Sequence, residues 1–422
     1  MAQAIGQAGY LETLAHRMNT SRVVALSSAV AFATQVAFAL LMLRWFSPQE
    51  VGEFSVISQI GFFWMTLALA QSQLSVLANQ HLSAHTAAQH AWRASLLRGL
   101  GLLPIAALAV WFSQLTMWPT LLWAMLLAVC QMGWMLAQSF TLRAGSAAQQ
   151  AAVRVLPPIT AAAVALTTAM AGVALGWHGP SLVLSALLGY AVGALWLVPA
   201  LHARANHATS TVSAVQTTTD NTILQPSDTR NVALRMTHTF FDAFLATSII
   251  MVWQRLYGAE ETGWMSALLR VLGFVPAVVH MAWTQVALAG GMSTRQTASA
   301  NLVWLGFGGF VCVVSLGLAC ATALHLGWLA PKWSGSLDYV LPLVAWQGCA
   351  CLSAAFSHRP FQNQAAERYS IACIGLALLQ VLILLAPIIF DISISTHIHF
   401  YAFSLISSLA LLVLTAWMSK LS

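Results

Sequence analysis

Charged residues are scarce in this 422-residue chain. Only 7% of the residues are Asp, Glu, Lys or Arg, whereas 59% are apolar, and the mean hydropathy is +0.77. Soluble domains carry about 25% charged residues, so this chain has too few charges to cover a surface that faces water. The composition therefore excludes a soluble globular protein and a disordered one. It predicts a membrane protein that crosses the bilayer many times.

Other features are missing as well. No short apolar segment followed by a cleavage site opens the chain, so we expect residues 1–22 to stay as a cytosolic segment. The six cysteines all lie in apolar runs, which predicts free thiols rather than disulfides. We find no nucleotide-binding loop, no nucleophile elbow and no metal-ligand spacing. We therefore expect no catalytic residue, no cofactor and no metal.

Twelve apolar segments are long enough to cross a bilayer, which requires about 20 residues. Inside lipid each must be helical, because every backbone group needs an internal partner. The sequence thus predicts an all-α polytopic membrane protein. The predicted spans are 23–43, 53–77, 95–112, 120–142, 155–175, 181–203, 232–253, 264–289, 300–328, 339–357, 370–388 and 398–418.

The basic residues predict the orientation. With the N-terminus in the cytosol, 13 of the 17 Lys and Arg fall on the cytosolic side, three on the outer side and one, Arg270, inside a span. Cytosolic loops carry such an excess, so both termini are predicted to be cytosolic, in the inner (cytoplasmic) membrane. The net charge of +6 forms no basic stripe, and we expect no nucleic-acid partner.

The chain divides into two halves. A polar stretch, 204–231, is predicted to be a cytosolic linker between two six-helix bundles, 23–203 and 232–418, and residues 419–422 form a cytosolic tail. An internal repeat supports this division. With a constant offset of 211, Arg44 matches Arg255, Glu50 matches Glu261, Gly52 matches Gly263, Ser55 matches Ser266, and the aromatic Phe46 matches Tyr257. Both copies join the first two spans of a half, as a parallel repeat requires.

The first copy of the repeat has a local explanation. Ser47 suits a helix N-cap, Pro48 the first helical position, and Glu50 the third position of a capping box. Gly52 allows close backbone packing. We expect a capped turn that folds one span against the next.

The same segment resembles a known family. An apolar span, the sequence Arg44-Trp45-Phe46-Ser47-Pro48-Gln49-Glu50-Val51-Gly52-Glu53-Phe54, and a second apolar span are similar to the opening of polysaccharide transporters. These belong to the multidrug/oligosaccharidyl-lipid/polysaccharide (MOP) exporter superfamily, and the nearest branch is the O-antigen flippases of the Wzx type. Val51 departs from the family pattern, which has an aromatic residue there. The basic segments Arg143-Ala144-Gly145 and Gln364-Ala365-Ala366-Glu367-Arg368 are also similar to loops of the family.

The resemblance implies a MOP/MATE-like fold with two six-helix bundles and transport by alternating access. The implied substrate is a polyprenyl-diphosphate-linked oligosaccharide, moved across the inner membrane for surface polysaccharide (O-antigen) synthesis. Membrane lipids and other polysaccharide-assembly proteins are the implied partners. For a diphosphate substrate the resemblance also leads us to expect a cationic cavity, yet Arg270 is the one arginine deep inside a predicted span.

Charges inside spans are costly and are candidates for function. Asp242 lies near the middle of the seventh span and Arg270 in the outer part of the eighth, so the two side chains could meet. Arg235, His238 and Asp242 share one helix face, and Arg98 and Arg154 lie near cytosolic ends. We expect these six residues to bind substrate or couple transport. The alternative is that Asp242 and Arg270 form a structural pair.

Two other functions compete with the flippase. A drug or organic-cation antiporter of the same superfamily would bind its cation at Asp242. A membrane-embedded glycan polymerase or ligase would need a large outer loop to hold its acceptor, and the predicted outer loops have ten residues or fewer. The sequence therefore favours a transporter over an enzyme.

Overall fold

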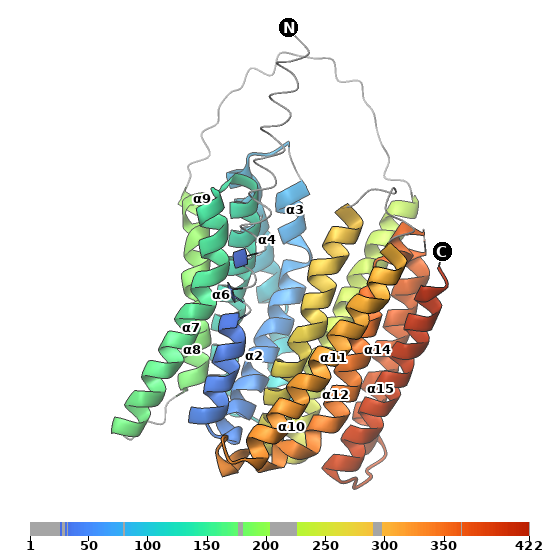
Figure 1. Cartoon of the computed structure of the whole chain (residues 1–422). Coiled ribbons are helices and arrows are strands. Elements are labelled where there is room, and N and C mark those ends of the chain that lie inside the picture. Colours follow the sequence, from blue (N-terminus) through green and yellow to red (C-terminus); the bar gives the residue numbers. More distant parts are fainter. Residues whose placement is uncertain are drawn as a thin grey trace, which may run out of the picture. The chain divides into compact units, whose positions relative to one another are not determined.

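The computed structural model describes residues 26–27, 30–31, 33–78, 81–175, 180–202, 226–289, 298–363 and 365–421. In these residues the chain forms helices joined by short turns, and none of them lies in a β-strand. Figure 1 shows long helices running roughly alongside one another within each part of the chain. The all-α prediction is therefore confirmed for the part of the chain that the structure describes.

The first half begins with the helix Ala33–Trp45. It continues with α2 (Pro48–Leu69), α3 (Ser72–Ala78), α4 (Ala84–Gly101), α5 (Leu103–Phe112), α6 (Met117–Ala144), α7 (Ala147–Leu175), α8 (Ser181–Ala194), the 3₁₀-helix η1 (Leu195–Leu197) and α9 (Val198–His202). The second half comprises α10 (Pro226–Ala289), α11 (Ala298–His325), the 3₁₀-helix η3 (Pro331–Ser336), α12 (Leu337–Phe356), α13 (Arg359–Gln362), α14 (Ala366–Ile389) and α15 (Thr396–Ser419).

The helix lengths agree with about twelve membrane spans. Among the described residues, nine helices are long and apolar enough to cross a membrane, and the bent pair α4–α5 makes a tenth. One of them, Met236–His280, has 45 residues, which at about 1.5 Å per residue is more than twice the roughly 30 Å of a bilayer core. It therefore represents two spans. With the helix Ala33–Trp45 the count reaches twelve.

Helix α10 folds back on itself at Gly258. This residue has φ 86° and ψ −179°, a conformation that only glycine adopts without strain. Figure 1 shows that the two arms of α10 end on the same side of the molecule, with the turn at the opposite end. The seventh and eighth predicted spans are thus the two arms of one helical hairpin.

Two helices differ from the predicted spans. Helix α10 begins at Pro226, so the last residues of the predicted linker, 226–231, are helical. Proline suits the first turn of a helix, where its missing N–H has no partner to lose. The remaining linker residues, 204–225, lie outside the described residues. The second predicted span is also not continuous: it breaks at Ala70 and Gln71, which have φ of 41° and 63°.

The structured residues form two compact units. One contains the described residues up to Leu41, together with Ile60–Leu108 and 116–202, and the other contains Met42–Gln59, Ala109–Leu115 and the described residues from 226 onward. The opening of α2 therefore packs with the second half of the sequence. The bundle limits 23–203 and 232–418 stay a prediction.

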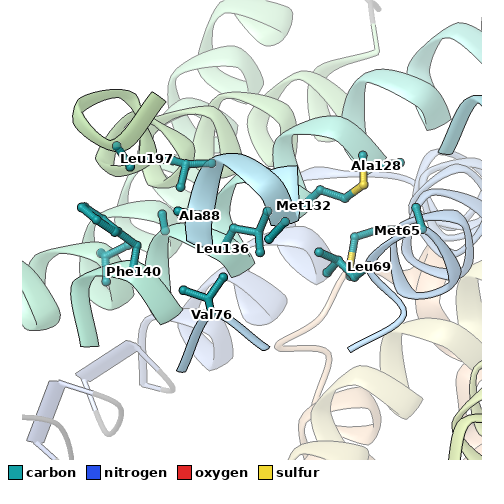
Figure 2. Close-up of a cluster of buried hydrophobic side chains, with 14 of the residues drawn as sticks. Met65, Leu69, Val76, Ala88, Ala128, Met132, Leu136, Phe140 and Leu197 are labelled. Carbon is teal, nitrogen blue, oxygen red and sulfur yellow. The ribbon is translucent and has the colours of Figure 1, made fainter. Parts of the chain in front are cut away.

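The first unit is built around an apolar core. Its buried side chains come from the end of α2 and from α3, α4, α5, α6, α7, η1 and α9. Figure 2 labels nine of them: Met65, Leu69, Val76, Ala88, Ala128, Met132, Leu136, Phe140 and Leu197. Indole N–H groups join its helices, because Trp64 donates to Gly99 O (2.8 Å) and Trp134 to Val153 O (2.7 Å).

Glycine also brings helices together in this unit. A Cβ added at Gly189 would lie 2.7 Å from Pro157 O on α7, and one at Gly193 would lie 2.3 Å from Trp134 Cδ1 on α6. The two glycines, one turn apart on α8, allow this close approach.

Candidate functional site

The two copies of the repeat pack against each other. A Cβ added at Gly52 would lie 1.9 Å from Ala259 O, and a Cβ added at Gly263 would lie 1.8 Å from Pro48 O. The two contacts are equivalent, since Pro48 and Ala259 are also related by the offset of 211. Gly52 of the first copy meets Ala259 of the second, and Gly263 of the second meets Pro48 of the first. Such reciprocal contacts are what a two-fold arrangement requires. We call this contact the repeat crossing.

Ser55 and Ser266 lie at the centre of the repeat crossing. Their hydroxyl oxygens are 2.9 Å apart, and both side chains are buried. They are equivalent residues, so a hydrogen bond between them places a local two-fold axis close to the two oxygens. The predicted duplication is therefore supported by geometry as well as by sequence.

The predicted capping box is present in the first copy. The backbone N–H and the hydroxyl of Ser47 both donate to Glu50 Oε2 at 2.7 Å, and the N–H of Glu50 donates to Ser47 Oγ at 3.2 Å. Helix α2 begins at Pro48, as expected. These bonds supply partners for N–H groups that a helix start otherwise leaves unpaired.

Arg270 is held at the repeat crossing. Its Nη2 donates to Ser55 Oγ and Ser58 Oγ, both at 3.2 Å, and its guanidinium carbon lies 4.5 Å from the centre of the Phe54 ring. These three partners are uncharged. They orient the guanidinium, and the ring attracts its charge.

Asp242 lies on the first arm of α10 and contacts His238. Its Oδ2 is 3.2 Å from His238 Nε2, and its side chain is 61% exposed. The His238 ring packs edge-on against Tyr369 of α14, with ring centres 5.9 Å apart.

The sequence suggested that Asp242 and Arg270 could meet, but in the structure the two side chains contact different residues. Asp242 faces His238 on its own helix, whereas Arg270 faces the serines of α2. Measured from Gly258, Asp242 is 16 residues back and Arg270 is 12 residues on, so the two lie at similar depths along the hairpin. Similar depth in the membrane was therefore not sufficient to bring the Asp242 and Arg270 side chains together.

The other predicted site residues have separate positions. Arg98 of α4 donates to Leu69 O (3.1 Å) and Ser72 Oγ (2.6 Å), which holds the break between α2 and α3. Arg154 of α7 is half-buried and donates to Gln150 O of the same helix at 3.2 Å. Arg235 is in α10, and its side chain lies outside the described residues.

Sequence reasoning missed a buried polar network near the turn of α10. Trp253 Nε1 donates to Tyr339 Oη (2.9 Å), and the Tyr339 hydroxyl donates to Glu261 Oε2. Tyr257 Oη lies 2.9 Å from His399 Nδ1. The available signal was the position of the two residues near the predicted outer side, Tyr257 in the loop between spans seven and eight and His399 at the start of span twelve. We call these five residues the aromatic–histidine network.

No metal-ligand cluster of His, Cys, Asp or Glu occurs among the described residues. The six cysteines, all of which fall in the described ranges, are free thiols.

Over the described residues, the helices define the all-α fold of a polytopic membrane protein with about twelve spans. Known structures share this fold. Over 92% of its length the chain matches 93% of a structure described as the inward-facing conformation of a multidrug resistance MATE family transporter of the MOP superfamily, with a TM-score of 0.55 and 12% identity. It also matches lipid II flippase MurJ in an inward closed conformation, over 95% of this chain and 98% of that chain, with a TM-score of 0.50 and 11% identity.

These two likenesses confirm the predicted MOP/MATE-like fold. No protein-family model and no curated protein sequence matches the chain. At 11–12% identity the likeness concerns the fold alone.

Proposed function

We propose that this chain is a flippase for a lipid-linked oligosaccharide. Its substrate is a polyprenyl-diphosphate oligosaccharide, moved by alternating access from the cytosolic to the outer leaflet of the inner membrane for surface polysaccharide (O-antigen) synthesis. The fold supports a transporter, since one structure with the same fold is a lipid II flippase and another is a multidrug transporter. Membrane lipids and other polysaccharide-assembly proteins are the proposed partners.

The observation that carries the proposal is the setting of Arg270. A cation inside a membrane span costs about 2.5–3.5 kcal/mol on insertion scales, so it needs a compensating role. The hydroxyls of Ser55 and Ser58 and the ring of Phe54 hold the guanidinium in a defined orientation. A guanidinium held in this way suits a phosphate or diphosphate group, which it can bind through two N–H groups at once.

The remaining predicted residues extend this assignment. Asp242 and His238 are proposed to couple transport, and Arg235, Arg98 and Arg154 to guide the anionic head group from the predicted cytosolic side. Arg98 would do so in addition to holding the break between α2 and α3.

Reconstituted protein tests the proposal. Vesicles containing a fluorescent polyprenyl-diphosphate oligosaccharide should lose inner-leaflet label faster with wild-type protein than without it. Arg270→Gln should abolish this acceleration, and Arg270→Lys should restore part of it, because lysine keeps the charge but not the planar pair of donors. Arg44→Gln, which removes an exposed arginine, is the matched control and should transport normally. Equal flipping by wild type and Arg270→Gln would refute the role of Arg270.

A cell-based test addresses the substrate. Deletion of the gene should remove surface polysaccharide and cause lipid-linked repeat units to accumulate in the inner leaflet. Normal polysaccharide after deletion would contradict the flippase assignment.

A drug or organic-cation antiporter is the second candidate. The exposed carboxylate of Asp242 favours it, since a carboxylate accessible within a span can bind a cation directly. An antiporter of this kind would export a cationic dye and lose that activity in Asp242→Asn. Dye export by wild type without flipping of the oligosaccharide lipid would favour this second function.

A further inference from the structure

The aromatic–histidine network surrounds a buried imidazole. His399 is 3% exposed. Its ring stacks on the indole of Trp253, with ring centres 5.0 Å apart. Both ring nitrogens have partners: Nε2 lies 3.1 Å from Ile383 O, and Nδ1 lies 2.9 Å from Tyr257 Oη. With both nitrogens hydrogen-bonded, the buried ring is held in one orientation.

Pro387 determines which nitrogen carries the proton. In a helix, Ile383 O would accept the N–H of residue 387, but proline has no N–H. The carbonyl is therefore available to His399. A carbonyl only accepts, so Nε2 must carry a hydrogen and donate it. In neutral His399 the other nitrogen, Nδ1, is then a bare acceptor for the hydroxyl of Tyr257.

We propose that His399 Nδ1 is a proton-binding site that drives transport. When a proton from water binds Nδ1, the new N–H donates to Tyr257 Oη, and the Tyr257 hydroxyl turns its own hydrogen to Ile394 O, which lies 3.5 Å away. Nε2 continues to donate to Ile383 O. Every hydrogen has an acceptor before and after the step, so the site accommodates both charge states with one hydroxyl rotation.

The surroundings suit such a site. The face of Trp253 stabilises the imidazolium through its π-electrons. Tyr257 is only half-buried, so it connects the buried ring with the surface. On the predicted topology this end of the hairpin faces the outer side, the side from which a proton gradient would supply protons.

The helices around His399 carry further ionisable groups. Helix α10 contributes Glu261, which accepts the Tyr339 hydroxyl of α12, and the exposed Glu260. Asp338 of α12 is 3.7 Å from His397 on α15, and both of these side chains are more than half exposed. Helix α14 contributes the Ile383 carbonyl. Glu261 is the carboxylate that belongs to the network itself, through the Tyr339 hydroxyl.

The site connects with the repeat crossing through the chain itself. Tyr257 immediately precedes Gly258, and Gly263 packs on Pro48 five residues later. A reversed hydrogen bond at Tyr257 therefore acts on the turn that sets the position of the crossing. This role in transport rests on the proposed function, whereas proton binding does not.

Proton binding can be measured without transport. Protonated imidazole quenches the fluorescence of an indole stacked on it, so purified wild-type protein should show a one-proton change in tryptophan emission between about pH 8 and pH 5. The change should be absent in Trp253→Phe and in His399→Gln, whose amide keeps an acceptor and a donor but binds no proton. His397→Gln, two residues away and exposed, is the control and should behave as wild type. An unchanged titration in His399→Gln would overturn the proposal.

Transport gives the second measurement. In vesicles with an imposed pH gradient, wild type and His397→Gln should flip the oligosaccharide lipid faster than without the gradient, and His399→Gln should lose this stimulation. Tyr257→Phe should still titrate, with a shifted midpoint, but should also lose the stimulation. It provides the test if His399→Gln does not accumulate. Full stimulation in both variants would refute coupling. If wild type titrates but flips nothing, the proposed function fails while the proton site stands.

Discussion

The repeat crossing predicts a large effect from a single methyl group. In Gly52→Ala the new Cβ would lie 1.9 Å from Ala259 O, whereas ordinary contacts begin at 3.4 Å. The obstructing atom belongs to the backbone, so no change of rotamer relieves the clash. The two segments must therefore separate by about 1.5 Å. Overpacking of this kind costs about 1–3 kcal/mol, and alanine returns at most about 1 kcal/mol of helix propensity.

We therefore expect Gly52→Ala to lower the free energy of unfolding by about 1–2 kcal/mol. Gly263→Ala, with its Cβ 1.8 Å from Pro48 O, should cost the same. The double variant should cost less than the sum, because the first substitution has already separated the segments. Titration of the purified protein with SDS, followed by circular dichroism, measures these changes.

A matched control distinguishes steric conflict from a general effect of alanine. Gly308 lies within α11, and a Cβ added there would meet no atom within 4 Å. Gly308→Ala should therefore be neutral or stabilise the protein by up to about 1 kcal/mol. If Gly52→Ala proves as stable as Gly308→Ala, the close contact at the repeat crossing does not exist.

Further predictions concern the cap, the topology and the two charges. Ser47→Ala should destabilise the protein by about 1 kcal/mol in the same SDS titration, because it removes the cap of α2; no loss would disprove the capping role. Reporter fusions should indicate cytosol at Gln216 and the outside at Ser334, and a cytosolic signal at Ser334 would overturn the predicted orientation. Since Asp242 and Arg270 contact different partners, the stability effects of Asp242→Asn and Arg270→Gln should add within about 0.5 kcal/mol. A coupling energy well above that value would instead support the alternative that Asp242 and Arg270 form a structural pair.

Much of the fold could be predicted because membrane spans are a local property. An apolar run of sufficient length must be helical in lipid, so each of the twelve predicted spans overlaps a described helix. Turn chemistry was equally local: Ser47, Pro48 and Glu50 act within one helical turn. The directions in which the helices run could not be predicted in this way. Hydropathy measures length, and it gave no sign of the 50° bend between α4 and α5.

The partners of the site residues depended on packing. The repeat identified Ser55 and Ser266 as equivalent, but only the crossing of two helices shows that they bond and that Arg270 joins them. Similarly, His399 lies in an ordinary apolar run. Its role becomes visible when Pro387 of α14 and Tyr257 of α10 are brought against its two nitrogens.

The two copies of the repeat have diverged at the residues that carry the proposed chemistry. Gly258 occupies the position of Ser47, so Glu261 has no capping hydroxyl of the kind that Glu50 holds. Its carboxylate accepts the Tyr339 hydroxyl instead. At the preceding position Tyr257 replaces Phe46 and adds the hydroxyl that meets His399. The first copy is thus closed by bonds within its own turn, whereas the second directs the equivalent groups toward α12 and α15. The first turn hydrogen-bonds to itself, whereas the second hydrogen-bonds to other helices. On the proposal above, only the second turn therefore changes its hydrogen bonds when His399 takes up a proton.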